Sequence, residues 1–317
     1  MKNASLMTFT IGLLLALLFA AGGPIRAQRS DRQRGSITIN TDLVIIDVHV
    51  TDQNNQPVFN LFNKEDFTVF EDDVKQEIAQ ISRDDAPVSF GLVIDTSGSM
   101  IAILPMLCDS AFDLVRRIRP GDEAFVAQFR DEPELVQDFT FDRRKLEVAI
   151  GELYSSGNNS LFDAIIATAD YAKEKAKNRR KVLVVFTDGQ ELKDNPVKEK
   201  EAIEAINQNG VQAYFVGILG KNPYYKSSTK KDKDLLLRLA SGSGGRALFP
   251  KNAGEIRAVA AQVVNDLGAQ YVLSYYPTND KRDGTFRSVK VIINDNSKRK
   301  LIARARQGYY ARKEYAH

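Results

Sequence analysis

Hydrophobic and polar positions along the chain follow two different periods, and their alternation predicts the architecture. Residues 92–94 and 181–186 are nearly continuous apolar runs, which are typical of strands buried on both faces of a parallel sheet. Other stretches place apolar residues three or four apart, as at Leu104, Leu107 and Ala111, which indicates one buried face of a helix. Because the two patterns alternate from 87 to 267, we predict an α/β domain with a doubly wound, mostly parallel sheet.

Within this domain the pattern predicts six strands and six helices. We expect strands at 90–94, 123–129, 135–139 (an antiparallel edge strand), 181–186, 211–218 and 246–249. We expect helices at 104–118, 143–153, 160–177, 196–209, 235–240 and 253–267, with Pro196 as a first helical residue. Residues 221–234 are predicted to be a solvated basic loop; the alternative is that they grip an acidic partner.

The regions on either side of this domain have strand patterns only. A period of two at 44–50 predicts a half-buried strand with His49 facing solvent, and further strands are expected at 67–70 and 74–81. The C-terminal strands are expected at 270–276, 287–294, 301–305 and 308–310, with a hairpin-type turn at Asp283-Gly284. We expect the segments 36–86 and 268–312 to form one small all-β sandwich. The acids Glu71, Asp72 and Asp73 are expected to be solvated turn residues, the alternative being a second cation site.

The first 27 residues resemble a secretory signal peptide. Lys2 precedes an apolar run at 6–21, and Ala27 supplies a small residue before a polar linker at 28–35. We therefore expect an exported protein, periplasmic or extracellular, with no stable membrane span after cleavage; an uncleaved anchor is the alternative. Residues 313–317 are expected to be a tail.

Composition narrows the function classes only a little. The 317 residues carry a formal net charge of +3, which falls to +1 if Lys2 and Arg26 are removed with the signal segment. So small a balance gives no electrostatic pull toward nucleic acid, and we expect none as a partner. The single cysteine, Cys108, has no partner for an internal disulfide and is predicted to be a small buried hydrophobe.

Oxygen-bearing side chains follow two of the predicted strands. Asp95, Ser97 and Ser99 come directly after the strand at 90–94, and Asp188 comes directly after the strand at 181–186. Open α/β sheets bind their ligands at the carboxyl ends of their strands. Carboxylate and hydroxyl oxygens suit a small hard cation, so we expect Mg²⁺, or Mn²⁺ in its place.

These residues carry a family resemblance. The sequences DTSGS at 95–99, GNNSLFDA at 157–164 and TDG at 187–189 resemble the metal-ion-dependent adhesion site (MIDAS) of von Willebrand factor type A (VWFA) domains. The flanking segments resemble the bacterial, acidobacterial-type family of exported VWFA-related proteins. The resemblance implies that Ser97, Ser99 and one loop residue bind the metal directly, while Asp95 and Asp188 hold coordinated waters. It also implies an open metal position that accepts an Asp or Glu carboxylate from a protein ligand.

The loop departs from the family pattern, which has threonine at the ligand position. Here Asn159 occupies that position and Ser160 follows it. Ser160 and Asp163 form a capping-box pattern that would engage the Ser160 hydroxyl, so we favour Asn159 as the loop ligand and expect weaker or altered metal affinity. Ser160 remains the alternative ligand.

Three functions are compatible with the sequence. The first is an exported, non-enzymatic protein-binding or adhesion module that uses the metal site. The second is a Mg²⁺-dependent phosphotransferase or hydrolase, although Ser97 stands where an aspartyl-phosphate enzyme usually has a second acid. The third is a structural scaffold with a vestigial site.

Overall fold

The computed structural model describes residues 42–54, 56–61, 63–83, 86–191, 196–219, 230–294 and 300–313. The predicted signal segment, the linker, the start of the basic loop and most of the C-terminal tail lie outside these ranges. Among the described residues, no helix has both the length and the apolar character that a membrane span requires.

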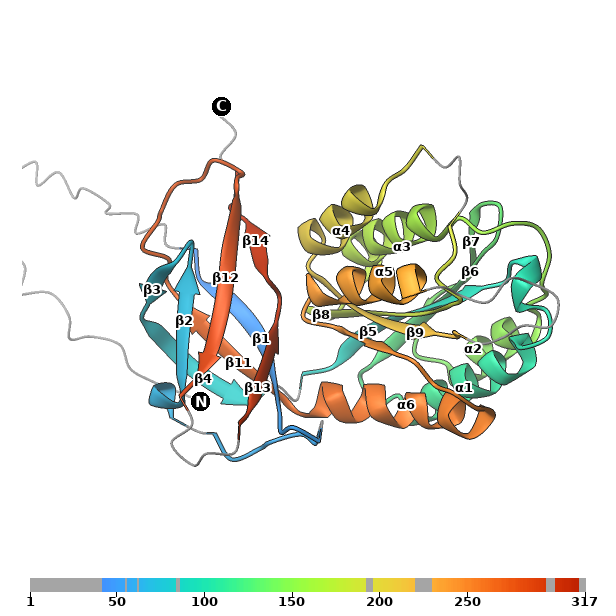
Figure 1. The fold of residues 1–317 in the computed structure, drawn as a ribbon, viewed down its shortest axis with the longest axis horizontal. Coiled ribbons are helices and arrows are strands. Elements are labelled where there is room, and N and C mark those ends of the chain that lie inside the picture. Colours follow the sequence, from blue (N-terminus) through green and yellow to red (C-terminus); the bar gives the residue numbers. More distant parts are fainter. Residues whose placement is uncertain are drawn as a thin grey trace, which may run out of the picture. The chain divides into compact units, whose positions relative to one another are not determined.

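A six-stranded sheet with helices on both faces forms the α/β part, as predicted (Figure 1). Its strand order is β10-β9-β8-β5-β6-β7, and all neighbours are parallel except the edge pair β6-β7. The strands are β5 (Val88–Asp95), β6 (Glu123–Phe129), β7 (Pro133–Thr140), β8 (Arg180–Thr187), β9 (Val211–Gly217) and β10 (Arg246–Leu248). The central strand β5 is buried along its whole length, which explains its unbroken apolar run.

Two hydrophobic cores lie on opposite faces of this sheet. Helices α1 (Leu104–Arg117), α2 (Arg143–Gly151) and α6 (Ala253–Gly268) pack on one face, where Leu92 and Ile94 of β5 point. Helices α3 (Leu161–Lys175), α4 (Glu199–Gln208) and α5 (Lys230–Ser241) pack on the other face, where Val93 points. Successive residues of β5 point to opposite faces of the sheet, so they belong alternately to the two cores.

Two four-stranded antiparallel sheets form the all-β unit, and each combines strands from both ends of the chain. One has the order β13-β1-β11-β4 and the other β14-β12-β2-β3. Their bounds are β1 (Val44–Thr51), β2 (Phe67–Glu71), β3 (Val74–Gln76), β4 (Ile78–Arg83), β11 (Gln270–Tyr275), β12 (Phe286–Ile293), β13 (Ile302–Ala305) and β14 (Gly308–Tyr310). A shared core that includes Ile46, Val69 and Leu273 joins the two sheets.

Several local predictions were wrong. The strands β11 and β12 do not form a hairpin around Asp283-Gly284, because β11 pairs with β1 and β4 while β12 pairs with β2 and β14. The stretch 74–81 is divided into the two strands β3 and β4, which belong to different sheets. Helix α4 begins at Glu199 and not at Pro196, since the carboxylate of Glu201 accepts a hydrogen bond from the backbone of Lys198 there.

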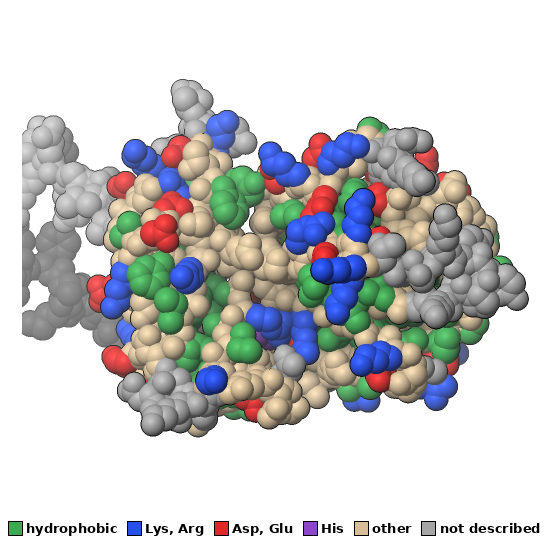
Figure 2. All heavy atoms as spheres, in the orientation of Figure 1, with side chains coloured by type: hydrophobic (Ala, Val, Ile, Leu, Met, Phe, Trp, Pro, Cys, Tyr) green, Lys and Arg blue, Asp and Glu red, His purple; other side chains and the backbone are tan. Residues whose placement is uncertain are grey.

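Helix α5 begins at Lys230, within the stretch predicted to be a loop. Its lysines 230, 231 and 233 are exposed while Leu235, Leu236 and Leu239 are buried, so the basic residues lie on the solvent face of an amphipathic helix. On the face of the molecule in Figure 2, acidic and basic side chains are intermixed.

Two polar residues that were expected to face solvent are buried instead. His49 is 1% exposed, because Gln212 and Gln270 contact its Nε2 atom on the side of β1 away from the sandwich core. Glu71 is 2% exposed and accepts hydrogen bonds from the hydroxyls of Tyr275 (2.6 Å) and Tyr309 (2.9 Å). Cys108 packs against the core beneath α1, α2 and α6 as a small hydrophobe, and it is partly buried where full burial was predicted.

Candidate metal centre

Asp95 and Asp188 lie at the carboxyl ends of two neighbouring parallel strands. Asp95 is the last residue of β5 and Asp188 follows the last residue of β8, and the two strands pair up to Ile94 and Phe186. Parallel neighbours end at the same edge of a sheet, so both carboxylates reach the same place. Both are buried, Asp95 completely.

Four donors surround the Asp95 carboxylate. Its Oδ1 accepts hydrogen bonds from the backbone N–H of Ser97 (3.0 Å) and from the Ser97 hydroxyl (2.6 Å). Its Oδ2 accepts from the hydroxyl of Thr187 (2.8 Å) and from the side-chain amide of Asn159 (2.8 Å). The carboxylate is therefore held in one orientation by residues from three separate segments.

The two serines connect Asp95 with Asp188. The hydroxyl of Ser99 donates to Asp188 Oδ2 at 2.7 Å, and the hydroxyls of Ser97 and Ser99 lie 3.0 Å apart. Gln190 also donates to Asp188, through its backbone N–H at 3.0 Å and its side-chain amide at 3.1 Å. The hydroxyl oxygens thus form a short chain between the two acids.

Asn159 completes the group from the third segment. Its Nδ2 donates to Asp95 at 2.8 Å and to Asp188 at 3.3 Å, whereas its Oδ1 is buried and has no hydrogen-bond partner. A buried amide oxygen without a donor is costly, and a cation is a natural partner for it. All five residues predicted from the sequence are therefore brought together.

Backbone contacts hold the Asn159 loop against the Ser97 turn. The N–H of Gly98 donates to the carbonyl of Gly157 at 3.0 Å, and the N–H of Ser156 donates to the carbonyl of Thr96 at 2.9 Å. Gly157 has a φ of +69°, and a Cβ there would lie 2.2 Å from Oδ2 of Asp131. A side chain at this position would displace the Asp131 carboxylate, and the positive φ itself favours glycine.

Ser160 has a different role from the predicted one. It precedes α3 but makes no side-chain cap; its hydroxyl donates instead to the backbone carbonyl of Arg130 at 2.7 Å. The N–H of Phe162 in the first turn donates to the carboxylate of Glu191 at 2.7 Å. The capping box was therefore wrong, although the hydroxyl of Ser160 is engaged elsewhere, as the preference for Asn159 assumed.

The electrostatics of the pair follow from burial. Loss of solvent around Asp95, together with the negative charge of Asp188, raises the pKa of Asp95 to about 7. Burial likewise raises the pKa of Asp188. Two buried carboxylates side by side destabilise each other's charged form, and a divalent cation would relieve this repulsion.

Two contributing residues had no predicted role, although Thr187 belongs to the TDG motif at 187–189. Thr187 bonds Asp95 and also accepts the N–H of Gly189 at 3.0 Å, and Gln190 bonds Asp188. The position of Thr187, just before an acid at a strand end, is the one available signal. In the described part of the chain, no group of three or more His, Cys, Asp and Glu side chains could hold a metal. The candidate site combines two acids with neutral side-chain oxygens.

Comparisons with known proteins agree with this fold. Residues 90–190 match the family model described as von Willebrand factor type A domain, and the predicted resemblance is confirmed there. A von Willebrand factor type A structure from Catenulispora acidiphila covers 87% of this chain and 74% of its own, at 13% identity and a TM-score of 0.50. This likeness supports the fold. No curated protein matches the chain.

Two further structures are similar over part of the chain. An aerotolerance-related membrane protein from Bacteroides fragilis has 15% identity, covers 57% of this chain and 98% of its own, and has a TM-score of 0.47. The vWF domain of the type V pili tip protein Mfa5 from Porphyromonas gingivalis has 14% identity, covers 56% and 95%, and has a TM-score of 0.45.

Proposed function

We propose that this chain, which contains a von Willebrand factor type A domain, is an exported, non-enzymatic protein-binding module. In this proposal, Asp95, Ser97, Ser99, Asn159 and Asp188 hold a Mg²⁺ or Mn²⁺ ion that coordinates an acidic side chain of a protein ligand. The observation that carries it is the convergence of two buried carboxylates on the side-chain amide of Asn159, whose Oδ1 is buried without a hydrogen-bond partner.

The donor set suits a hard divalent cation and would leave part of the ion's positive charge unneutralised. Mg²⁺ takes six oxygen ligands and keeps waters readily, and a bound ion would attract a further anionic oxygen. Ser97 and Ser99 supply neutral hydroxyls, so the ion's charge would be only partly neutralised by the two acids. The Nδ2 of Asn159 faces both acids, and a rotation of the side-chain amide would present its Oδ1 to the ion.

The surroundings of the site favour binding over catalysis. Each oxygen of Asp95 already accepts two hydrogen bonds and the residue is fully buried, which is unfavourable for a nucleophile. Large apolar side chains flank the loops: Ile101 is 61% exposed and Tyr154 is 57% exposed. A protein ligand would bury such residues around a central polar contact.

Metal binding is tested by titration calorimetry with Mg²⁺ and Mn²⁺. We expect saturable binding to the wild type and none to Asp95→Ala, with Asp113→Asn, a surface acid on α1, as the charge-matched control. Equal binding to wild type and Asp95→Ala would contradict the site.

Ligand binding is tested separately with Mn²⁺ bound. Water-proton relaxation should fall when the capped peptide acetyl-Gly-Glu-Gly-amide is added, because its carboxylate displaces metal-bound water. The matched peptide acetyl-Gly-Gln-Gly-amide, which has no carboxylate, should have no effect. A metal that binds without this difference would contradict the role assigned to the acidic ligand.

A further inference from the structure

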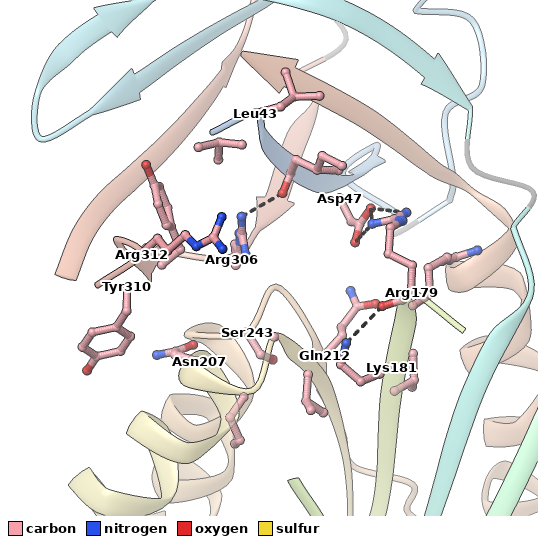
Figure 3. Close-up of a pocket in the computed structure, with 18 of the residues that line it drawn as sticks. Leu43, Asp47, Arg179, Lys181, Asn207, Gln212, Ser243, Arg306, Tyr310 and Arg312 are labelled. Carbon is pink, nitrogen blue, oxygen red and sulfur yellow. Dashed lines mark hydrogen bonds and ion pairs between the residues drawn. The ribbon is translucent and has the colours of Figure 1, made fainter. Parts of the chain in front are cut away.

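A cavity of about 450 Å³ lies at the end of the parallel sheet opposite the candidate metal centre (Figure 3). Residues 179–182 at the start of β8 and 210–212 at the start of β9 line one side, and residues of β1 and the segment 306–312 line the other. The eight residues of β8 separate it from Asp188, a distance of about 25 Å. The cavity is therefore independent of the metal site.

Basic side chains outnumber acidic ones around this cavity. The lining includes the five cations Arg179, Arg180, Lys181, Arg306 and Arg312, and only two acids, Asp42 and Asp47. Such a surplus in a concave, partly desolvated space concentrates positive potential.

Both acids are already engaged by arginines. Asp47 forms an ion pair with Arg179 at 3.3 Å, and Asp42 lies 3.1 Å from Arg282 and 3.7 Å from Arg312. Within the described residues, no carboxylate lies at ion-pair distance from Arg306 or Lys181. The charge of Asp47, which is itself paired with Arg179, acts on both side chains only from a greater distance.

Arg306 is the most constrained of the cations. Its guanidinium donates to the backbone carbonyl of Ile45 at 2.8 Å and lies 5.4 Å from the centre of the Tyr309 ring, while its Nε is buried without a hydrogen-bond partner. Burial lowers the pKa of Arg306. A buried donor on a charged group is costly unless an acceptor reaches it.

Lys181 is also a partly buried cation whose hydrogen bond goes to a backbone carbonyl. Its ammonium donates to the backbone carbonyl of Arg179 at 3.3 Å, and burial followed by the charge of Arg179 lowers its pKa.

Figure 3 shows Arg306 and Arg312 on one side of the cavity and Arg179 on the other. Cations on two sides suit a ligand that has an anionic group at each end.

We propose that this cavity binds a small ligand with two anionic groups, each a carboxylate or phosphate. Planar guanidinium groups recognise both kinds of group through paired N–H donors. Arg306 and Arg312 would hold one group, and Lys181 and Arg179 the other. A cavity of this size accommodates a small metabolite.

The test is titration calorimetry of the whole chain, stripped of metal with EDTA and then dialysed free of EDTA, with pyrophosphate, succinate and inorganic phosphate. We expect saturable binding of pyrophosphate or succinate, and the tighter of the two identifies the anionic group. Inorganic phosphate, with a single group, should bind about tenfold more weakly. Equal binding of phosphate and the tighter two-group ligand, or no binding of any probe, would overturn the proposal.

Three variants locate the binding. Arg306→Gln and Lys181→Gln should each weaken it about tenfold or more, while Arg257→Gln, which removes an exposed cation of α6, should leave it unchanged. Lys181→Gln keeps the test informative if Arg306→Gln does not fold. Asp95→Ala should bind the anion as the wild type does, which separates this site from the metal centre. Equal weakening by Arg257→Gln would overturn the assignment to the cavity.

Discussion

Ser99 donates a 2.7 Å hydrogen bond to Asp188 across 89 positions of sequence. Ser99 lies in the 3₁₀ turn Gly98–Met100 after β5, and Asp188 follows β8. The contact exists because β5 and β8 are parallel neighbours whose last residues reach one edge of the sheet. It joins the two segments that supply four of the five candidate ligands.

Replacing Ser99 tests whether its hydroxyl is a ligand. Ser99→Ala removes one oxygen donor and should weaken Mg²⁺ binding about tenfold or more, whereas Ser99→Thr keeps the hydroxyl and should bind within a few-fold of wild type. Calorimetry measures both. Ser241→Ala, on the exposed end of α5, is the control. Unchanged affinity in Ser99→Ala would exclude the hydroxyl from the site.

Acidity should stabilise the metal-free site. The folded pKa of Asp95 is about 7, above its ordinary value of 3.8, so between these pH values the folded state keeps a proton that the unfolded state has released. The contribution of Asp95 to the free energy of unfolding should therefore fall as pH rises from 4 to 7, by on the order of 1–4 kcal/mol. Asp95→Asn should lack this component.

The measurement is urea denaturation in EDTA across this pH range, taken as the difference between wild type and Asp95→Asn. Mg²⁺ at pH 8 should restore stability to the wild type and not to Asp95→Asn. A pH-independent difference between the two proteins would contradict the pKa shift.

Gly157 should be needed for metal binding as well as for stability. In Gly157→Ala the new Cβ would displace the Asp131 carboxylate, which accepts two hydrogen bonds from Asn158 beside Asn159, so Mg²⁺ affinity should fall. Gly210→Ala is the matched control, because Gly210 also has a positive φ but open space around it. It should lose about 1 kcal/mol of stability and keep its affinity. Calorimetry and thermal unfolding separate the two effects.

His49 should make the protein sensitive to acid. Burial, and then the charges of Arg304 and Arg180, hold its pKa well below 6.5, so the unfolded state takes up a proton first as the pH falls. Stability should decrease below pH 6.5, and His49→Gln should reduce this loss. Urea denaturation in the Asp95→Asn background isolates the effect, since Asp95 then contributes nothing. If the free energy of unfolding falls equally below pH 6.5 with and without His49→Gln, the assigned role of His49 would be refuted.

The strands and the candidate ligands were largely predictable from local pattern. Strands buried on both faces have apolar runs that end abruptly at a polar residue, and this identified Asp95 and Asp188. The failures involve partners distant in sequence. His49 follows the polar phase of β1 but is buried by Gln212 and Gln270, and no local pattern reports that contact. The role of Thr187 was not predicted for the same reason, because its hydrogen bond to Asp95 joins two strands.

By itself, the sequence determined the alternation of strands and helices in the α/β part and placed acids and hydroxyls at strand ends, because buried strands and amphipathic helices have different periods. Only the tertiary structure decided which strands are neighbours, and so that Asn159 points its amide at both acids and that Arg306 and Lys181 line one cavity. These relationships depend on segments brought together by packing, and a period along the chain carries no information about them.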